Sequence, residues 1–242
     1  MSVASAPYLH IRSGDVLLCS NNTATGFLLK SATSSAYNHS AIAIRLHNDE
    51  VSITDEGDLY LLELNQDKRF DILSGKAATG MTLTQWEWAM GRYNLMMCRR
   101  LRDEYRDSIF AVRAKSFITE HHGASFSQGL SPFLGVWLGV DLAGECRYGD
   151  TGKREFFCSE MMAEFYQYVF ERSLQDIFTM ACPSTAVLYK PAHFSVELSR
   201  DSLMFKDVEE QVHVQYCDGT MVLLQPLFIG LLLMLVLRGL LG

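Results

Sequence analysis

The sequence predicts an α+β fold in which an antiparallel sheet, or a partial barrel, packs against a helix that carries a cysteine. Apolar and small residues alternate over residues 39–46, as in a half-buried strand. Apolar residues follow Cys158 at positions 161, 162, 165 and 169, which is the spacing of one helix face. Residues 221–241 are almost entirely apolar, so the predicted fold class also includes a C-terminal transmembrane helix.

The chain of 242 residues is long enough for one domain with a single core, and its composition excludes one class of function. The formal net charge is −7, and no basic run or basic–aromatic mixture indicates a nucleic-acid groove. The six cysteines form no Cys-x-x-Cys pair, which is typical of a reducing compartment where a catalytic thiolate survives. We expect a catalytic domain over residues 1–205, a linker or edge strand over 206–220 and the membrane segment over 221–242.

The first predicted strands form a hairpin that carries a candidate catalytic base. Residues 26–35 precede it as a short helix or loop. In the strand 39–46, His39 shares a face with small residues that leave room for another element. Residues 47–50 make the turn, and the second strand, 51–55, ends in Asp55 and Glu56. A carboxylate there would accept the second ring N–H of His39 and fix the tautomer that takes a thiol proton. The structural alternatives are a half-buried histidine and an ordinary polar strand end.

The middle of the chain continues the sheet and adds a helix. We expect strands at 59–64, 69–73 and 95–100, a loop or short helix at 84–93, an amphipathic helix at 106–121 and a weak edge strand at 211–217. In that helix Ile109, Val112 and Phe117 are predicted to face inward. His121 and His122 have no further ligands at the usual metal-site spacings, so we expect neither a metal nor a cofactor.

Cys158 is the candidate nucleophile. It stands in the first turn of its predicted helix, where the macrodipole and free backbone N–H groups favour the thiolate, the form that attacks a carbonyl carbon. The same N–H groups would help to hold a developing oxyanion. The structural alternative is a buried cysteine that fills space.

The order of these segments resembles that of a known superfamily. A histidine on an early strand, a carboxylate on the next and a cysteine on a late helix is the order of the circularly permuted papain-like hydrolases. The chain is most similar to the YiiX/YebB-like branch of the NlpC-type superfamily and its poxvirus relatives. Residues 13–18 (SGDVLL) resemble the "GDLL" opening strand, 38–42 (NHSAI) the "SHVGI" histidine strand, 158–161 (CSEM) the "CSEL" nucleophile helix, 123–127 a glycine–aromatic segment and 182–184 a proline turn. The resemblance covers about residues 10–190.

The resemblance implies a permuted papain-like fold with a triad of Cys158, His39 and a carboxylate. In the family that carboxylate follows a run like "VIEA". Here Asp55 keeps the strand parity and Glu56 keeps the residue type, so both are candidates, with a preference for Glu56. Ser127 stands where the family often has an aspartate, and the loop over 130–154 is long. The lecithin–retinol-acyltransferase-like phospholipases share the order and a C-terminal membrane helix, but this chain lacks their "NCEHF" box and second histidine.

The apolar C-terminal run predicts a tail anchor. Its length approaches the roughly 20 residues that a helix needs to cross a bilayer, and residues 227–237 have no polar face. Pro226 suits a first helical turn, and Arg238 would reach the lipid headgroups. The alternative is a buried helix or an oligomerisation tail. The predicted location is therefore a membrane, with a single C-terminal anchor, the catalytic domain on the cytosolic side and the lipid bilayer as a partner.

Together these features predict a membrane-anchored thiol hydrolase or acyltransferase. His39 would take the proton of Cys158, and the thiolate would attack an ester or amide carbonyl to give a thioester acyl-enzyme. The anchor favours a lipid acyl or lipid-modified substrate. The alternatives are a cysteine peptidase or amidase acting on peptides, and a catalytically silent, membrane-tethered binding or structural protein.

Overall fold

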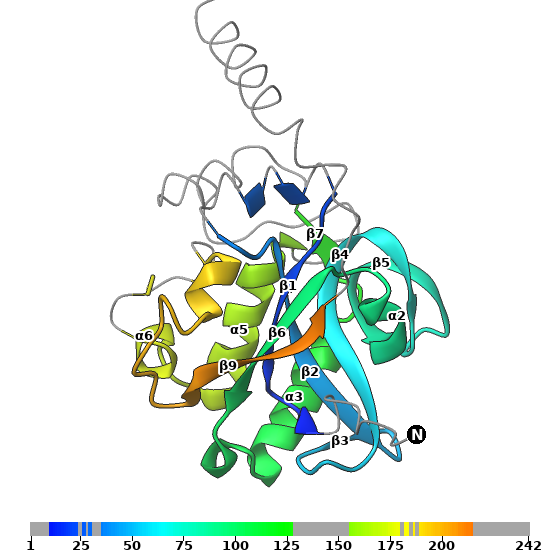
Figure 1. Cartoon of the computed structure of the whole chain (residues 1–242). Coiled ribbons are helices and arrows are strands. Elements are labelled where there is room, and N and C mark those ends of the chain that lie inside the picture. Colours follow the sequence, from blue (N-terminus) through cyan, green and yellow to red (C-terminus); the bar gives the residue numbers. More distant parts are fainter. Residues whose placement is uncertain are drawn as a thin grey trace, which may run out of the picture.

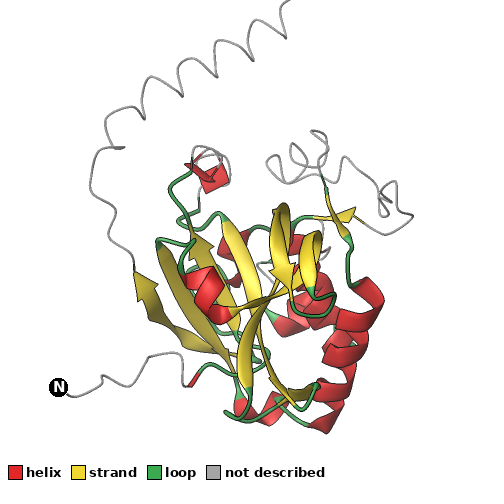
Figure 2. Cartoon of the chain, turned by 90° about the vertical axis from the view of Figure 1, so that its right-hand side faces the viewer, coloured by secondary structure: helices red, strands yellow, loops and turns green. Residues whose placement is uncertain are grey.

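The protein is built around one antiparallel sheet (Figures 1 and 2). The computed structural model describes residues 10–23, 26, 27, 29, 30, 35–127, 155–179, 182, 183, 186 and 189–214. The strands lie in the order β5–β4–β2–β1–β6–β9, and β3 pairs with the end of β2 on the side opposite to β4. Their bounds are β1 Val16–Ser20, β2 His39–His47, β3 Glu50–Ser52, β4 Asp58–Asp71, β5 Lys76–Gln85, β6 Leu95–Leu101 and β9 Phe205–Val214. A short parallel pair, β7 Ser125–Phe126 and β8 Glu155–Phe156, stands apart from this sheet.

Helices cover both faces of the sheet. The helical segments are α2 Trp86–Met90, η2 Asp103–Tyr105, α3 Ser108–His121, α5 Cys158–Phe170, α6 Leu174–Ile177 and η4 Pro191–Phe194. Alternation along the strands divides the core in two. Val16 and Leu18 belong to the larger cluster, which includes α3, α5 and α6, whereas Leu17 and Cys19 belong to the smaller cluster, which includes α2. The α+β class and the antiparallel sheet against the cysteine-bearing helix are therefore confirmed.

The predicted hairpin is present with different strand lengths. β2 begins at His39, and Asn48 and Asp49 have left-handed φ angles of 50° and 63°, as a tight two-residue hairpin turn requires. β3 ends at Ser52, three residues earlier than predicted. The strands expected at 59–64 and 69–73 are one long strand, β4, which pairs with the unpredicted strand β5.

The predicted helix over 106–121 corresponds to α3, but its buried face differs from the prediction. The Asp107 side chain accepts the Phe110 N–H, so it caps the helix and sets its start. Phe110 and Phe117 are buried as i and i+7, together with Ala114 and Ile118. Ile109 is 56% exposed and Val112 is 66% exposed, so the prediction that they face inward is wrong: their positions lie outside the stripe that this spacing defines.

The predicted membrane segment is not supported. Among the described residues no helix is long and apolar enough to cross a bilayer. Even α3, with 14 residues, spans only about 21 Å at a rise of about 1.5 Å per residue, whereas a bilayer core is about 30 Å thick. The C-terminal transmembrane helix of the predicted fold class, the tail anchor and the predicted membrane location are therefore not supported. The run over 221–242 on which that prediction was based lies outside the described residues.

Candidate active site

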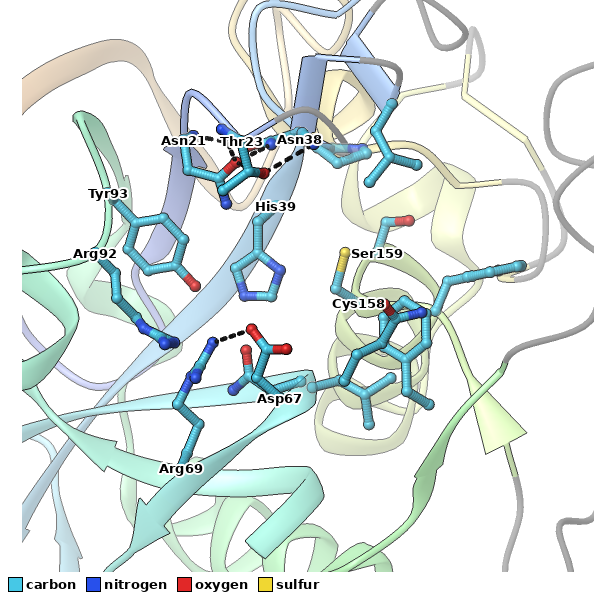
Figure 3. A pocket seen from close by; sticks show the side chains of 18 of the residues that line it. Asn21, Thr23, Asn38, His39, Asp67, Arg69, Arg92, Tyr93, Cys158 and Ser159 are labelled. Carbon is cyan, nitrogen blue, oxygen red and sulfur yellow. Dashed lines mark hydrogen bonds and ion pairs between the residues drawn. The ribbon is translucent and has the colours of Figure 1, made fainter. Parts of the chain in front are cut away.

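Cys158 begins α5 at the wall of a pocket of about 460 Å³ (Figure 3). Its side chain is nearly buried, with 8% of the residue surface exposed. Phe157, the N-cap residue, has an apolar side chain that offers no hydrogen-bond acceptor to the first turn. Glu160 accepts the Phe157 N–H at 3.1 Å, and the Ser159 hydroxyl donates to the Tyr189 carbonyl oxygen at 2.7 Å. These two hydrogen bonds fix the start of the helix beside the thiol.

His39 faces Cys158 from the first position of β2 (Figure 3). Its Nε2 lies 3.2 Å from Glu63 Oε2. Its ring stacks on Tyr93 with a centroid separation of 5.5 Å and an interplanar angle of 11°. The Tyr93 hydroxyl donates to the same Glu63 oxygen at 2.9 Å. Because Glu63 engages Nε2, Nδ1 is the ring nitrogen that remains for the Cys158 thiol.

The charges of the three groups depend on one another. Burial alone would raise the pKa of Cys158, but the charge and hydrogen bond of His39 and the Ser40 backbone N–H outweigh it, so the pKa of the thiol is lowered from 9.0. Burial would lower the pKa of His39, but Cys158 and Glu63 raise it to about 10. Burial would raise the pKa of Glu63, but hydrogen bonds from His39 and Tyr93 and the charge of His39 lower it below 4.5. The arrangement therefore favours the thiolate, imidazolium and carboxylate forms of the three groups over their neutral forms.

The site forms at the end of the sheet, where its two faces meet. Alternation along β2 and β4 places His39 on the face of Ala41 and Glu63 on the face of Leu61, both in the cluster that includes α2. Cys158 belongs to the other cluster. Because β2 begins at His39, no further strand residue separates its ring from the start of α5.

The structure does not bring Asp55 or Glu56 to His39. Both follow β3, which pairs with residues 45–47 of β2, and residue 45 lies about 20 Å along the strand from His39 at about 3.3 Å per residue. Asp55 forms an ion pair with Arg12 at 3.3 Å, and Glu56 is exposed. The carboxylate beside His39 is Glu63 of β4.

Glu63 was not predicted as a site residue, although the sequence contains a pattern that indicates it. Glu63 is the one charged residue in 59–64 (LYLLEL), an apolar run that was predicted as a strand. A charge within a buried apolar strand requires a partner. β2 pairs with β4 through Ile42 and Leu62, and continuing that register places Glu63 opposite Ala41, diagonal to His39.

The glycine–aromatic segment lies beside Cys158. β7 pairs in parallel with β8, so Phe126 stands next to Phe156, two residues before Cys158. Phe126 lines the pocket, and its ring contacts that of Phe157 at 5.9 Å between centroids. Ser127 is buried, and the long loop over 130–154 lies outside the described residues.

The His121–His122 pair has structural partners. His122 Nε2 lies 2.7 Å from Asp71 Oδ2, and the His121 ring stacks on Phe117 at 4.2 Å. In the part of the chain that the structure describes, no group of three or more His, Cys, Asp and Glu side chains is placed to hold a metal ion.

Comparisons with known proteins give a structural similarity of limited extent. No protein-family model matches the chain, and neither does a curated protein. Among solved structures the chain is similar to the metalloprotein yiiX of Escherichia coli O157:H7, DUF1105, with a TM-score of 0.47 and 12% identity over 86% of this chain and 99% of that chain. At this identity and TM-score the similarity assigns neither a family nor a function to this chain.

Proposed function

We propose that the protein is a thiol hydrolase or acyltransferase that acts on an ester or amide bond. Cys158 is the nucleophile, His39 the general base and acid, and Glu63 the carboxylate that orients His39. The observation that carries the proposal is the position of His39 at the wall of a pocket. Glu63 holds its Nε2, and its Nδ1 is left for the Cys158 thiol, whose pKa is lowered.

A comparison with Cys98 supports this reading of Cys158. Cys98 is also buried, and burial, followed by the negative charge of Asp15, raises its pKa well above 9.0. A cysteine that only fills space resembles Cys98. Cys158 differs in having a histidine, a carboxylate behind the histidine and access to a pocket.

The proposed reaction moves one proton between Cys158 and His39. His39 takes the thiol proton, and a sulfur lone pair forms the C–S bond while the carbonyl π electrons move to oxygen. Backbone N–H groups of the first α5 turn stabilise that oxyanion. The intermediate collapses as the bond to the leaving oxygen or nitrogen breaks and His39 protonates the leaving group, which yields a thioester. Water or another acceptor then gives a proton to His39 and attacks the thioester, releasing the acyl product and Cys158.

Thiol alkylation tests the proposal without knowledge of the substrate. The full-length protein is treated with iodoacetamide over a range of pH, and the labelling of each cysteine is followed by mass spectrometry. We expect Cys158 to react fastest, and at pH values below 9.0, because its pKa is lowered. His39→Gln should slow the reaction at neutral pH by about tenfold or more, since the thiolate loses its cation. His47→Gln, an exposed histidine at the other end of β2, is the matched control and should leave the rate unchanged.

Two results would overturn the proposal. One is labelling of Cys158 no faster than that of Cys98 at every pH. The other is an identical labelling rate in the His39→Gln and His47→Gln proteins. If Cys158 is activated, a panel of acyl esters and peptide amides, each assayed with and without added amine or alcohol acceptors, separates hydrolysis from transfer.

A further inference from the structure

Two arginines line the same pocket as the catalytic residues. Arg69 comes from β4, and Arg92 follows α2 and immediately precedes Tyr93, the residue stacked on His39. Figure 3 shows the guanidinium ends of Arg69 and Arg92 pointing toward one another, with His39 between them and Cys158. The Phe70 and Trp88 rings, 5.9 Å apart, connect this part of β4 to α2. The two cations are therefore gathered on the pocket wall that is remote from the thiol.

A bulge in β4 turns this part of the strand toward the pocket. Asn65 pairs with Gly80 and Arg69 pairs with Ala78, so three residues of β4 stand opposite one residue of β5. In a regular strand neighbouring side chains point to opposite faces. Here Asn65, Gln66, Asp67 and Arg69 all line the pocket. Bulges re-aim side chains in this way next to binding sites.

Both guanidinium groups have buried N–H groups without an acceptor. Arg69 donates to the Lys68 carbonyl oxygen at 3.2 Å and to Asp67 at 3.1 Å, but its Nε has no partner among the described residues. Arg92 Nη1 is likewise buried without a partner in the described part of the chain. A buried charged donor without an acceptor is unfavourable, so these two atoms favour a ligand that supplies oxygen atoms.

The charge of the pocket is opposite to that of the whole chain. Among the described residues, Arg69, Arg92 and Lys190 line it together with one carboxylate, that of Asp67, whose side chain is 78% exposed. The chain as a whole carries a formal charge of −7. A cationic pocket in an acidic protein attracts and orients anions.

We propose that Arg69 and Arg92 form an oxyanion-binding subsite, so that the substrate of Cys158 carries a phosphate or carboxylate group on the side remote from the scissile bond. This inference rests on the proposed function of the pocket. Guanidinium groups bind both kinds of oxyanion through paired N–H donors. The subsite would select among esters or amides by their charge, while Cys158 and His39 perform the reaction.

Calorimetric titration of the full-length protein tests the subsite independently of catalysis. The probes are phenyl phosphate, phenylacetate and, as the uncharged reference, benzyl alcohol. We expect at least one of the two anions to bind and benzyl alcohol not to bind. Arg69→Gln and Arg92→Gln should each weaken anion binding by about tenfold or more, because each removes a charged hydrogen-bond donor. Lys68→Gln removes a positive charge from the same bulge without altering the pocket lining, and it should leave binding unchanged.

The outcomes separate this inference from the proposed function. Binding of neither anion, or equal binding by the wild type and both arginine variants, overturns the subsite even when iodoacetamide shows an activated Cys158. Arginine-dependent binding together with an unreactive Cys158 leaves an anion site but overturns its role in selecting a substrate. Arginine-dependent binding that slows the alkylation of Cys158 supports both. The anion that binds with the higher affinity shows whether the subsite prefers a phosphate or a carboxylate.

Discussion

Glu63 is a carboxylate with no exposed surface, and its neighbours explain how the fold accommodates it. Removing a carboxylate from water costs several kcal/mol unless a cation and hydrogen bonds compensate for the loss. Tyr93 supplies a hydrogen bond, and His39, with its pKa raised to about 10, supplies the cation at neutral pH. The same imidazolium stabilises the Cys158 thiolate on its other side. One charged histidine thus stabilises two buried anions.

Glu63→Gln keeps the size of the side chain and removes its charge. We expect the turnover of an ester substrate to fall by up to about 10⁴-fold, the loss that follows when the carboxylate of a catalytic triad becomes an amide. Alkylation of Cys158 at neutral pH should slow as well, because the pKa of His39 falls when Glu63 is neutral. Glu56→Gln is the control, since Glu56 is exposed and lies far from His39. Equal activity of the two variants would contradict the role given to Glu63.

The pH dependence of turnover follows from two pKa shifts. The pKa of Cys158 is lowered from 9.0, and that of His39 is raised to about 10. The reactive ion pair therefore exists at pH values above the lowered pKa of the thiol and below about 10. The ratio kcat/KM should rise with pH through the lowered pKa of the thiol. It should fall near pH 10, where His39 loses the proton that it gives to the leaving group. A rising limb at the ordinary thiol value of 9.0, measured by stopped-flow or steady-state assay, would show that no ion pair forms.

At the scale of elements, the entry into β1 ties three parts of the fold together. Asp15 is fully buried, and it accepts the Arg12 and Leu101 backbone N–H groups at 2.9 Å each and pairs with Arg106, the residue that precedes α3 by two positions. Gly14 has φ +87°, and a Cβ atom there would lie 2.7 Å from Phe110 of α3. Gly14 and Asp15 therefore fix β1 against β6 and α3. This explains why a glycine and an aspartate precede the strand in the "GDLL"-like segment.

Asp15→Asn should strongly destabilise the protein. It leaves the buried Arg106 guanidinium without its buried anion, and breaking a buried ion pair in this way costs about 3–5 kcal/mol in the free energy of unfolding. Asp103 also pairs with Arg106, at 3.0 Å, but its side chain is 60% exposed. Asp103→Asn should therefore change the free energy by only about 0–1 kcal/mol. Urea unfolding of the two variants measures the difference, and similar losses in both would refute the argument.

Elements with a strong local pattern were predictable from the sequence. The apolar spacing after Cys158 matches α5, and the alternation after His39 matches β2, because both segments bury one continuous stripe or face. The α3 stripe was misplaced because Ile109 and Val112 are apolar residues that the fold leaves exposed. β5 was missed because its first four residues are not buried and alternate only weakly, so the partner strand rather than the local pattern determines it.

At the scale of the whole molecule, His39, the proposed base, stands at the start of a central strand of the sheet. β2 lies between β1 and β4, and its first seven residues are buried, as is all of β1. The edges are β5 and β9, and both contain exposed positions. A residue on a strand that is paired on both sides moves little, which suits a base that must stay aligned with Cys158.

Hydrogen exchange should follow this arrangement. We expect the amide hydrogens of β1 and β2 to exchange last, through global unfolding, and those of β9 and of the first half of β5 to exchange much earlier through local opening. Mass spectrometry of peptides from the intact protein resolves these segments. Exchange of β2 as fast as that of β9 would show that the sheet centre is not the stable core.

Which residues meet in the site depends on how the strands pair, so the sequence predicted only some of them. Cys158 and His39 were identifiable because each begins an element with a clear pattern. Glu63 could not be assigned as the partner of His39 without the β2–β4 register, which is a tertiary property. The same holds for Arg69, whose direction depends on a bulge, and for Arg92, which reaches the pocket from beyond α2.

The bulge in β4 has a consequence for how the protein can change. Residues 66–68 have no paired partners to lose, while the pairs Asn65–Gly80 and Arg69–Ala78 hold the hairpin on either side. An insertion or deletion of one residue between those pairs changes how far this segment extends into the pocket. It leaves the register of the sheet and the positions of Cys158, His39 and Glu63 unchanged. Substrate preference in this fold can therefore diversify by changes in length at one short segment, separately from both stability and chemistry.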